Sequence, residues 1–146
     1  MSFDFWANTE LLDTLKRANP LNERALLLFS HLISVNTIWL NRLKGETIST
    51  PLFQERTLIE CENVMLENDR NWTAFLQNIS DSELEMTIEF HFPIDNTHRI
   101  MRKADAIFQI TNHSSYHRGQ IVSLIKGSVA ELPHLGFVFF ASQIKM

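Results

Sequence analysis

The chain has 146 residues, of which 45% are hydrophobic and 21% charged, and its formal net charge is −4. This length can bury a sizeable core without disulfides, and the composition is ordinary for a globular protein, so we expect a single domain over residues 1–146. The negative net charge gives no sign of a basic surface that would bind phosphates, which argues against nucleic acid as a partner.

Cellular location is predicted from three features of the sequence. The single cysteine, Cys61, excludes an internal disulfide and is typical of a reducing compartment. Residues 1–6 show no basic segment followed by an apolar run, so we expect no secretory signal. No apolar run approaches the roughly 18 residues that span a bilayer. These features predict a cytoplasmic protein with no membrane partner.

Long helices are predicted because only four Gly and four Pro interrupt the chain. Apolar residues at helical spacing predict a first helix over Phe3–Ala18, which ends before Asn19-Pro20. A second helix is expected to begin between residues 20 and 22 and to end at Lys44, with Gly45 as its stop.

A third helix is predicted over about Thr57–Ile79, after a loop over residues 46–53 that is rich in Thr, Ser and Pro. Its inward side is expected to carry the apolar residues Leu58, Cys61, Met65, Trp72, Leu76 and Ile79. Its other face is interpreted as a solvated surface made of Glu60, Glu62, Glu67, Asn68, Asp69 and Arg70.

The pattern then changes to a period of two over Glu85–Phe92, which is typical of a half-buried strand. Turn residues lead to a second candidate strand, Thr97–Met101, so a small β-hairpin is expected. A fourth long helix is predicted over Asp105–Lys126, and a short apolar helix over Phe137–Ile144 is expected to close one end. The fold class is therefore all-α, a four-helix bundle with a hairpin before its last long helix.

Three of the six histidines occupy inward positions of these helices. His31 follows Leu28 by three residues and precedes Val35 by four, on the apolar side of the second helix. His113 and His117 are four residues apart on the fourth long helix, so their imidazoles project from one face. If the two helices are neighbours at the same height, the three side chains form an open metal site with room for water or substrate.

Structural roles for these histidines remain an alternative. A lone His on an apolar face is more often a hydrogen-bonded core residue, and an i, i+4 pair also arises on exposed faces. Three at inward positions favour a metal, because burying an imidazole without a partner costs roughly 1–3 kcal/mol. Imidazole ligands alone select poorly among zinc, nickel, iron and manganese. The other histidines, His91, His98 and His134, are expected on the surface or in local hydrogen bonds.

The segments around the three histidines resemble a known family. His113-Ser-Ser-Tyr-His117-Arg118-Gly119-Gln120-Ile121, preceded by Asn112, resembles the signature helix of the DinB-like (YfiT-like) metalloenzymes. His31–Leu43, with its Trp39-Leu40, resembles the second-helix motif of that family. The resemblance covers nearly the whole chain. It implies a bundle with an up-down-down-up course and a long crossover.

The resemblance also implies a divalent metal, often nickel or zinc, on three histidines, which here are His31, His113 and His117. It implies a homodimer and a small-molecule substrate, and its characterised members include transferases and isomerases that use low-molecular-weight thiols such as bacillithiol or mycothiol. It assigns no catalytic residue here. The segment Gly136–Ala141 departs from the family's pattern, because it lacks an acidic residue that many relatives carry there.

Residues beside the ligands have predicted roles of their own. Gly119 is interpreted as permitting close helix packing, and Arg118 and Gln120 as bonding to neighbouring loops, with direct substrate binding as the alternative. Asn112 and Tyr116 are candidates to orient a ligand imidazole.

Two functions are consistent with these patterns. The first is a metal-dependent enzyme, a thiol S-transferase or hydrolase, in which thiol or water at the open site attacks a small electrophile. The second is a non-catalytic, stress-related dimer that binds a metal or small ligand, with the metal serving stability. A closed structural site needs a fourth protein ligand, and the sequence offers no obvious one.

Overall fold

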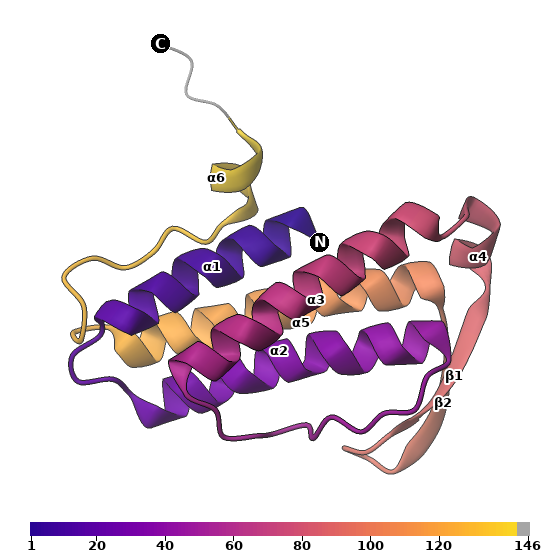
Figure 1. The fold of residues 1–146 in the computed structure, drawn as a ribbon, viewed down its shortest axis with the longest axis horizontal. Coiled ribbons are helices and arrows are strands. Elements are labelled where there is room, and N and C mark those ends of the chain that lie inside the picture. Colours follow the sequence, from indigo (N-terminus) through magenta and orange to yellow (C-terminus); the bar gives the residue numbers. More distant parts are fainter. Residues whose placement is uncertain (143–146) are drawn as a thin grey trace.

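The computed structural model describes residues 1–142, and four long helices form its bundle (Figure 1). They are α1 (Ser2–Arg17), α2 (Glu23–Lys44), α3 (Leu58–Asn78) and α5 (Lys103–Ile125). Helices α1 and α5 run one way along the bundle, and α2 and α3 run the other way. The segment over residues 45–57, called the crossover segment below, returns the chain between the parallel α2 and α3. The predicted all-α bundle and its up-down-down-up course are confirmed.

Caps fix both ends of α2 and the start of α3 where the sequence predicts them. The Asn22 side chain accepts a hydrogen bond from the Ala25 N–H at 3.0 Å, and Gly45 ends α2 with a positive φ of 72°. At the start of α3, Thr57 and Glu60 form a reciprocal capping box. These caps satisfy backbone groups that a helix end otherwise leaves unpaired.

The predicted hairpin consists of β1 (Thr87–Phe92) and β2 (Thr97–Arg102), which pair antiparallel with Phe90 opposite Arg99. Phe90 is buried and packs edge-on against Trp39 of α2 at 5.0 Å between ring centroids. The guanidinium of Arg42 lies over both rings, 4.7 Å from each centroid. An aromatic and cationic cluster thus attaches the hairpin to the C-terminal end of α2.

Two short helices differ from expectation. Helix α4 (Asp81–Glu85) is not predicted, because five residues are too few to show a periodicity, although the Ser80–Glu83 capping box marks its start. Helix α6 covers Phe137–Ala141, which is shorter than the predicted Phe137–Ile144, and residues 143 and 144 lie outside the described residues. It lies beside α1 instead of closing an end of the bundle.

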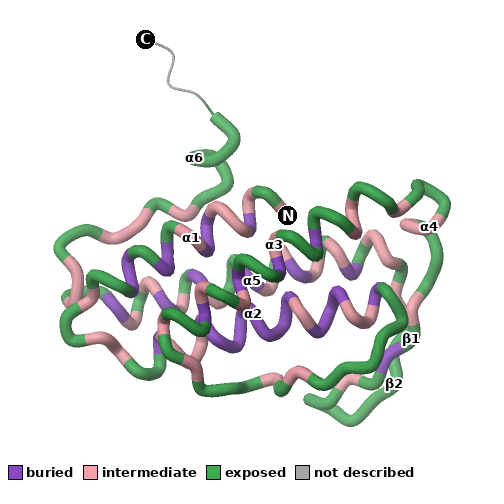
Figure 2. Tube along the Cα trace, in the orientation of Figure 1, coloured by how far each residue is buried: buried purple, intermediate pink, exposed green. Residues whose placement is uncertain are grey.

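Apart from Phe90 of β1, the buried residues line the inner faces of the four long helices (Figure 2). Of the predicted inward residues of α3, Cys61, Met65 and Trp72 are buried, whereas Leu58, Leu76 and Ile79 are half-buried. Asn68 is buried, so its assignment to the solvated face was wrong. Its side chain donates to the Ile33 carbonyl at 2.9 Å and accepts from the Thr37 hydroxyl at 2.8 Å. Two hydrogen bonds to α2 therefore offset the cost of burying this amide.

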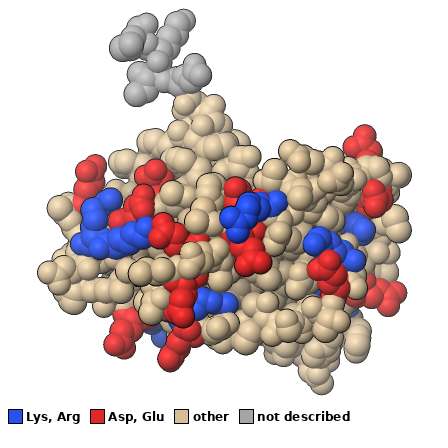
Figure 3. All heavy atoms as spheres, in the orientation of Figure 1, with Lys and Arg blue, Asp and Glu red and all other residues tan. Residues whose placement is uncertain are grey.

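The surface carries both signs of charge. On the face drawn in Figure 3, Lys and Arg side chains lie among Asp and Glu side chains, without a basic stripe. Across residues 1–142, no helix is both long and apolar enough to cross a bilayer.

Candidate metal centre

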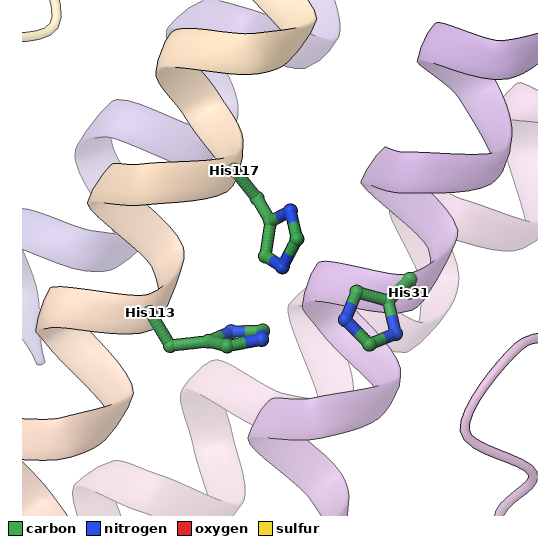
Figure 4. Close-up of side chains that lie close together, drawn as sticks. All are labelled: His31, His113 and His117. Carbon is green, nitrogen blue, oxygen red and sulfur yellow. The ribbon is translucent and has the colours of Figure 1, made fainter. Parts of the chain in front are cut away.

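His31 of α2 meets His113 and His117 of α5 between the two helices (Figure 4). One ring nitrogen from each residue lies within 4.8 Å of the others. The centroid of the His31 ring is 5.2 Å from that of His113 and 4.8 Å from that of His117, and the last two are 4.4 Å apart. Among residues 1–142 these three form the one group of His, Cys, Asp or Glu side chains with a spacing suited to a metal ion. The predicted convergence is confirmed, and metal ligation stays a prediction.

The packing of α2 on α5 brings the cluster together. The two helices pack along their lengths, and Ile110 and Ile121 are fully buried on α5, one on each side of the histidine pair. His31 is only 5% exposed, whereas His113 and His117 are half-buried. The cluster therefore lies at the edge of the core, with His113 and His117 partly exposed to solvent.

Hydrogen bonds fix two of the three rings in the form that binds a metal. Nδ1 of His31 donates to the Leu52 carbonyl at 2.8 Å, and Nδ1 of His117 donates to Oε1 of Gln120 at 2.7 Å. A neutral ring that donates from Nδ1 carries its lone pair on Nε2. Figure 4 shows a nitrogen at the end of each ring that points toward the other two. Such bonds to the outer nitrogen are the usual support of metal-bound histidines.

Burial favours the neutral forms of His31 and His113. Burial, with a smaller contribution from the neighbouring His117 and His31, lowers the pKa of His113 to about 3. Burial also lowers the pKa of His31. Among the described residues no group lies within hydrogen-bond distance of Nδ1 of His113, which is buried. Three imidazole nitrogens within 4.8 Å of one another fit a divalent ion such as zinc or nickel.

The low pKa of His113 makes the stability of the metal-free protein dependent on pH. Its pKa is about 3 in the folded chain, against an ordinary value of 6.5 for the unfolded chain. Below pH 6.5 the unfolded state therefore binds more protons, so stability present above pH 6.5 is lost as the pH falls toward 3. Urea unfolding of the metal-free protein at several pH values measures this loss. We expect the free energy of unfolding to fall less steeply with decreasing pH in His113→Ala than in His134→Ala. Equal pH dependences in the two variants would contradict the low pKa of His113.

The structure places Arg118 in a buried network that joins α5 to α1 and α2. Its Nη1 donates to Asp4 at 2.6 Å and to Asn8 at 2.9 Å, and Arg118 and Asp4 are both 2% exposed or less. Asp4 also accepts from Ser114 and Asn36, each at 3.2 Å. A structural role for Arg118 is thus confirmed, but its partners lie on helices and not on loops. Because Arg118 follows His117, the network fixes the rotation of α5 that turns the histidines toward α2.

Gln120, and not Asn112 or Tyr116, orients a ligand ring. Asn112 is exposed and Tyr116 is 64% exposed, and neither donates to or accepts from a histidine of the cluster. Asn112 and Tyr116 each precede a histidine of the cluster by one position, so their side chains point about 100° away from that histidine around the helix. Gln120 lies about one helical turn beyond His117, on the same side of α5. The packing role predicted for Gly119 was also wrong, since a Cβ there would meet no atom within 4 Å.

Replacing Gln120 by alanine tests this support. We expect metal affinity to fall about 10–100-fold, because the His117 ring loses the bond that sets its tautomer and orientation. Competition with a chromogenic chelator measures the affinity. Gln120→Glu keeps an acceptor oxygen and is expected to retain most of the affinity. Asn112→Ala, at an exposed position of the same helix, is the matched control, and an equal loss in both alanine variants would contradict this role.

One surface groove lies away from the histidines. It has a volume of about 690 Å³ near the N-terminal ends of α2 and α3, where Arg24, Leu27 and Arg56 are among its lining residues, and none of the three histidines lines it. We place the candidate site at the histidines, because a functional site depends more on converging reactive side chains than on the volume of a pocket.

Inward side chains on facing helices, like these three histidines, are what helical bundles use when they build a metal centre. The sequence profile of the DinB family matches residues 17–135, a range that includes all three histidines, and the chain belongs to this family. No curated protein matches the chain, so the comparison establishes the family and not a particular activity.

Proposed function

We propose that the protein is a metal-dependent enzyme in which His31, His113 and His117 hold a divalent ion, and that it transfers a thiol or water to a small electrophile. The observation that carries this proposal is the convergence of three imidazoles from two helices, with one ring nitrogen of each within 4.8 Å of the others. Two of the rings already donate from Nδ1 to fixed acceptors, so their Nε2 atoms are free to bind.

The protein residues have defined roles in such a reaction. The histidines hold the ion without adding negative charge, and the half-buried position of His113 and His117 leaves one side open. A divalent ion bound there supplies Lewis-acid chemistry, which lowers the pKa of a thiol or water beside it. Leu52 and Gln120 keep two of the ligand rings in the binding tautomer through their acceptor oxygens.

A thiol transfer of this kind is a nucleophilic substitution. The thiol sulfur forms a bond to the electrophilic atom of the substrate, the leaving group departs with its bonding electron pair, and the thiol proton passes to solvent. The cluster contains no carboxylate among residues 1–142, so we assign no general base.

Metal titration and thiol consumption test the proposal together. We expect one nickel or zinc ion to bind per chain in equilibrium dialysis. We also expect the loaded protein to consume bacillithiol or mycothiol in the presence of a chloronitroarene, while the metal-free protein does not. A chain that shows no saturable binding would contradict the metal site. A loaded chain that consumes no thiol, and hydrolyses no activated ester either, would contradict the enzymatic part.

The alternative of a non-catalytic metal protein makes a different prediction. A structural site is usually closed by four protein ligands, and the described part of the chain brings three together. If the metal served stability alone, chelation would lower the melting temperature strongly and the loaded site would bind no added ligand. We favour the enzyme because the fourth position is free of protein ligands among those residues.

Three further parts of the proposal rest on the family resemblance or on composition. We propose nickel or zinc as the metal, a homodimer as the assembly, and the cytoplasm as the location, the last because the one cysteine, Cys61, is buried and free. Light scattering of the purified protein tests the dimer, and elemental analysis of protein purified without added metal tests the ion.

A further inference from the structure

Two exposed aromatic side chains contact rings of the histidine cluster. Phe53 stacks on His31 with 4.2 Å between ring centroids and 12° between ring planes. Tyr116 meets His117 edge to face at 5.2 Å. Phe53 is 54% exposed and Tyr116 is 64% exposed, so most of each ring is open to solvent. Exposed aromatic rings that contact a cluster of polar groups are candidates to line a ligand site, because such sites combine apolar surface with a few polar groups.

The two rings reach the cluster from different parts of the chain. Phe53 belongs to the crossover segment, and the preceding residue, Leu52, accepts the hydrogen bond from His31. Tyr116 lies on α5 between the two ligand positions 113 and 117. One ring is therefore held against the α2 side of the cluster and the other against the α5 side. Neither ring belongs to the buried core.

We propose that Phe53 and Tyr116 form the apolar binding surface of this centre, and that its substrate carries a flat apolar group next to the atom that meets the metal. The inference rests on the proposed function, because it takes the three histidines as ligands. Flat rings pack against a planar substituent in stacked or edge-to-face arrangements and select it over a polar one. The hydroxyl of Tyr116 adds one polar group at the rim of this surface.

A pair of metal-binding probes, imidazole and 4-phenylimidazole, separates the apolar surface from the metal. Calorimetric titration of the zinc- or nickel-loaded protein gives the affinity for each, and the ratio of the two affinities reports the contact with the phenyl group. We expect wild type to prefer 4-phenylimidazole by about tenfold or more. We expect Phe53→Ala and Tyr116→Ala each to lower this ratio about 3- to 10-fold, with little change for imidazole itself.

Two further variants sharpen the result. Phe53→Trp keeps a flat ring and is expected to retain the preference. Phe108→Ala removes a side chain that is also on α5 and is 73% exposed, but that has no ring contact with the cluster. It is expected to leave the ratio unchanged. A ratio that stays constant in Phe53→Ala and Tyr116→Ala overturns the inference. An equal loss of affinity for both probes also overturns it, because it would show that the rings only support the histidines.

Failure of the metal site gives a separate result. If wild type binds no metal, the proposed function is wrong, and the metal-free protein is titrated with 4-phenylimidazole while the aromatic ring signals are followed by NMR. Shifts at Phe53 and Tyr116, absent from Phe108, would still support an apolar binding surface. Unchanged signals at both residues would overturn it.

Discussion

Replacement of Arg118 by methionine is expected to lower the free energy of unfolding by about 3–5 kcal/mol. The variant leaves the carboxylate of Asp4 buried, 1% exposed, without the cation that it faces at 2.6 Å. Asn8 loses its donor at the same time. Urea unfolding at neutral pH, with far-UV circular dichroism of the folded state, measures the loss.

A control variant separates the loss of a buried ion pair from the loss of an exposed one. Lys16→Met breaks a pair with Glu62 at 2.8 Å in which both side chains are more than a third exposed, and water screens such a pair. Its effect is expected to be far smaller. The double variant Asp4→Asn with Arg118→Met removes both charges and should recover part of the stability. An Arg118→Met protein as stable as Lys16→Met would show that the buried pair contributes little.

Replacement of His113 by alanine is expected to abolish tight metal binding. The substitution removes one of the three proposed ligands. Loss of a hydrogen-bond partner of a ligand lowers metal affinity roughly 10–100-fold, and loss of the ligand itself should lower it further. Elemental analysis after dialysis gives the metal content, and chelator competition gives the affinity. The fold should persist, because the ring is half-buried and its Nδ1 has no partner among residues 1–142.

The matched control for this substitution is His134→Ala, at an exposed histidine outside the cluster. We expect this variant to keep the metal content of wild type. Undiminished metal in His113→Ala, or an equal loss in both variants, would contradict the three-histidine site.

The bundle and the meeting of the histidines were predictable because both depend on patterns that repeat along the chain. Inward spacings of three and four set the faces of α2 and α5, and Gly45 and the Thr57 cap mark ends that the local backbone requires. His31 shares its face with apolar neighbours, so a partner across the helix interface was expected for it.

Polar residues of the core were less predictable. Asp4 and Asn68 occupy positions where composition indicates solvent, and hydrogen-bond partners far away in the sequence, such as Arg118 for Asp4 and Ile33 for Asn68, explain their burial. The support from Gln120 was missed for a different reason. Its spacing of three from His117 was visible, but the rotamer that turns its oxygen to Nδ1 depends on packing. Contacts that join distant segments leave little trace in local periodicity.

The placement of all three ligands on long helices has a thermodynamic consequence. Helices α2 and α5 are held in place by apolar packing and by the Arg118–Asp4 network, so the ligands are positioned before any ion arrives. Metal uptake then buries little additional apolar surface, unlike the coupled folding of a zinc finger. We therefore expect a heat-capacity change near zero for metal binding in calorimetry at several temperatures. In this chain the core orders the three histidines, so the proposed ion would bind a site that folding has already formed.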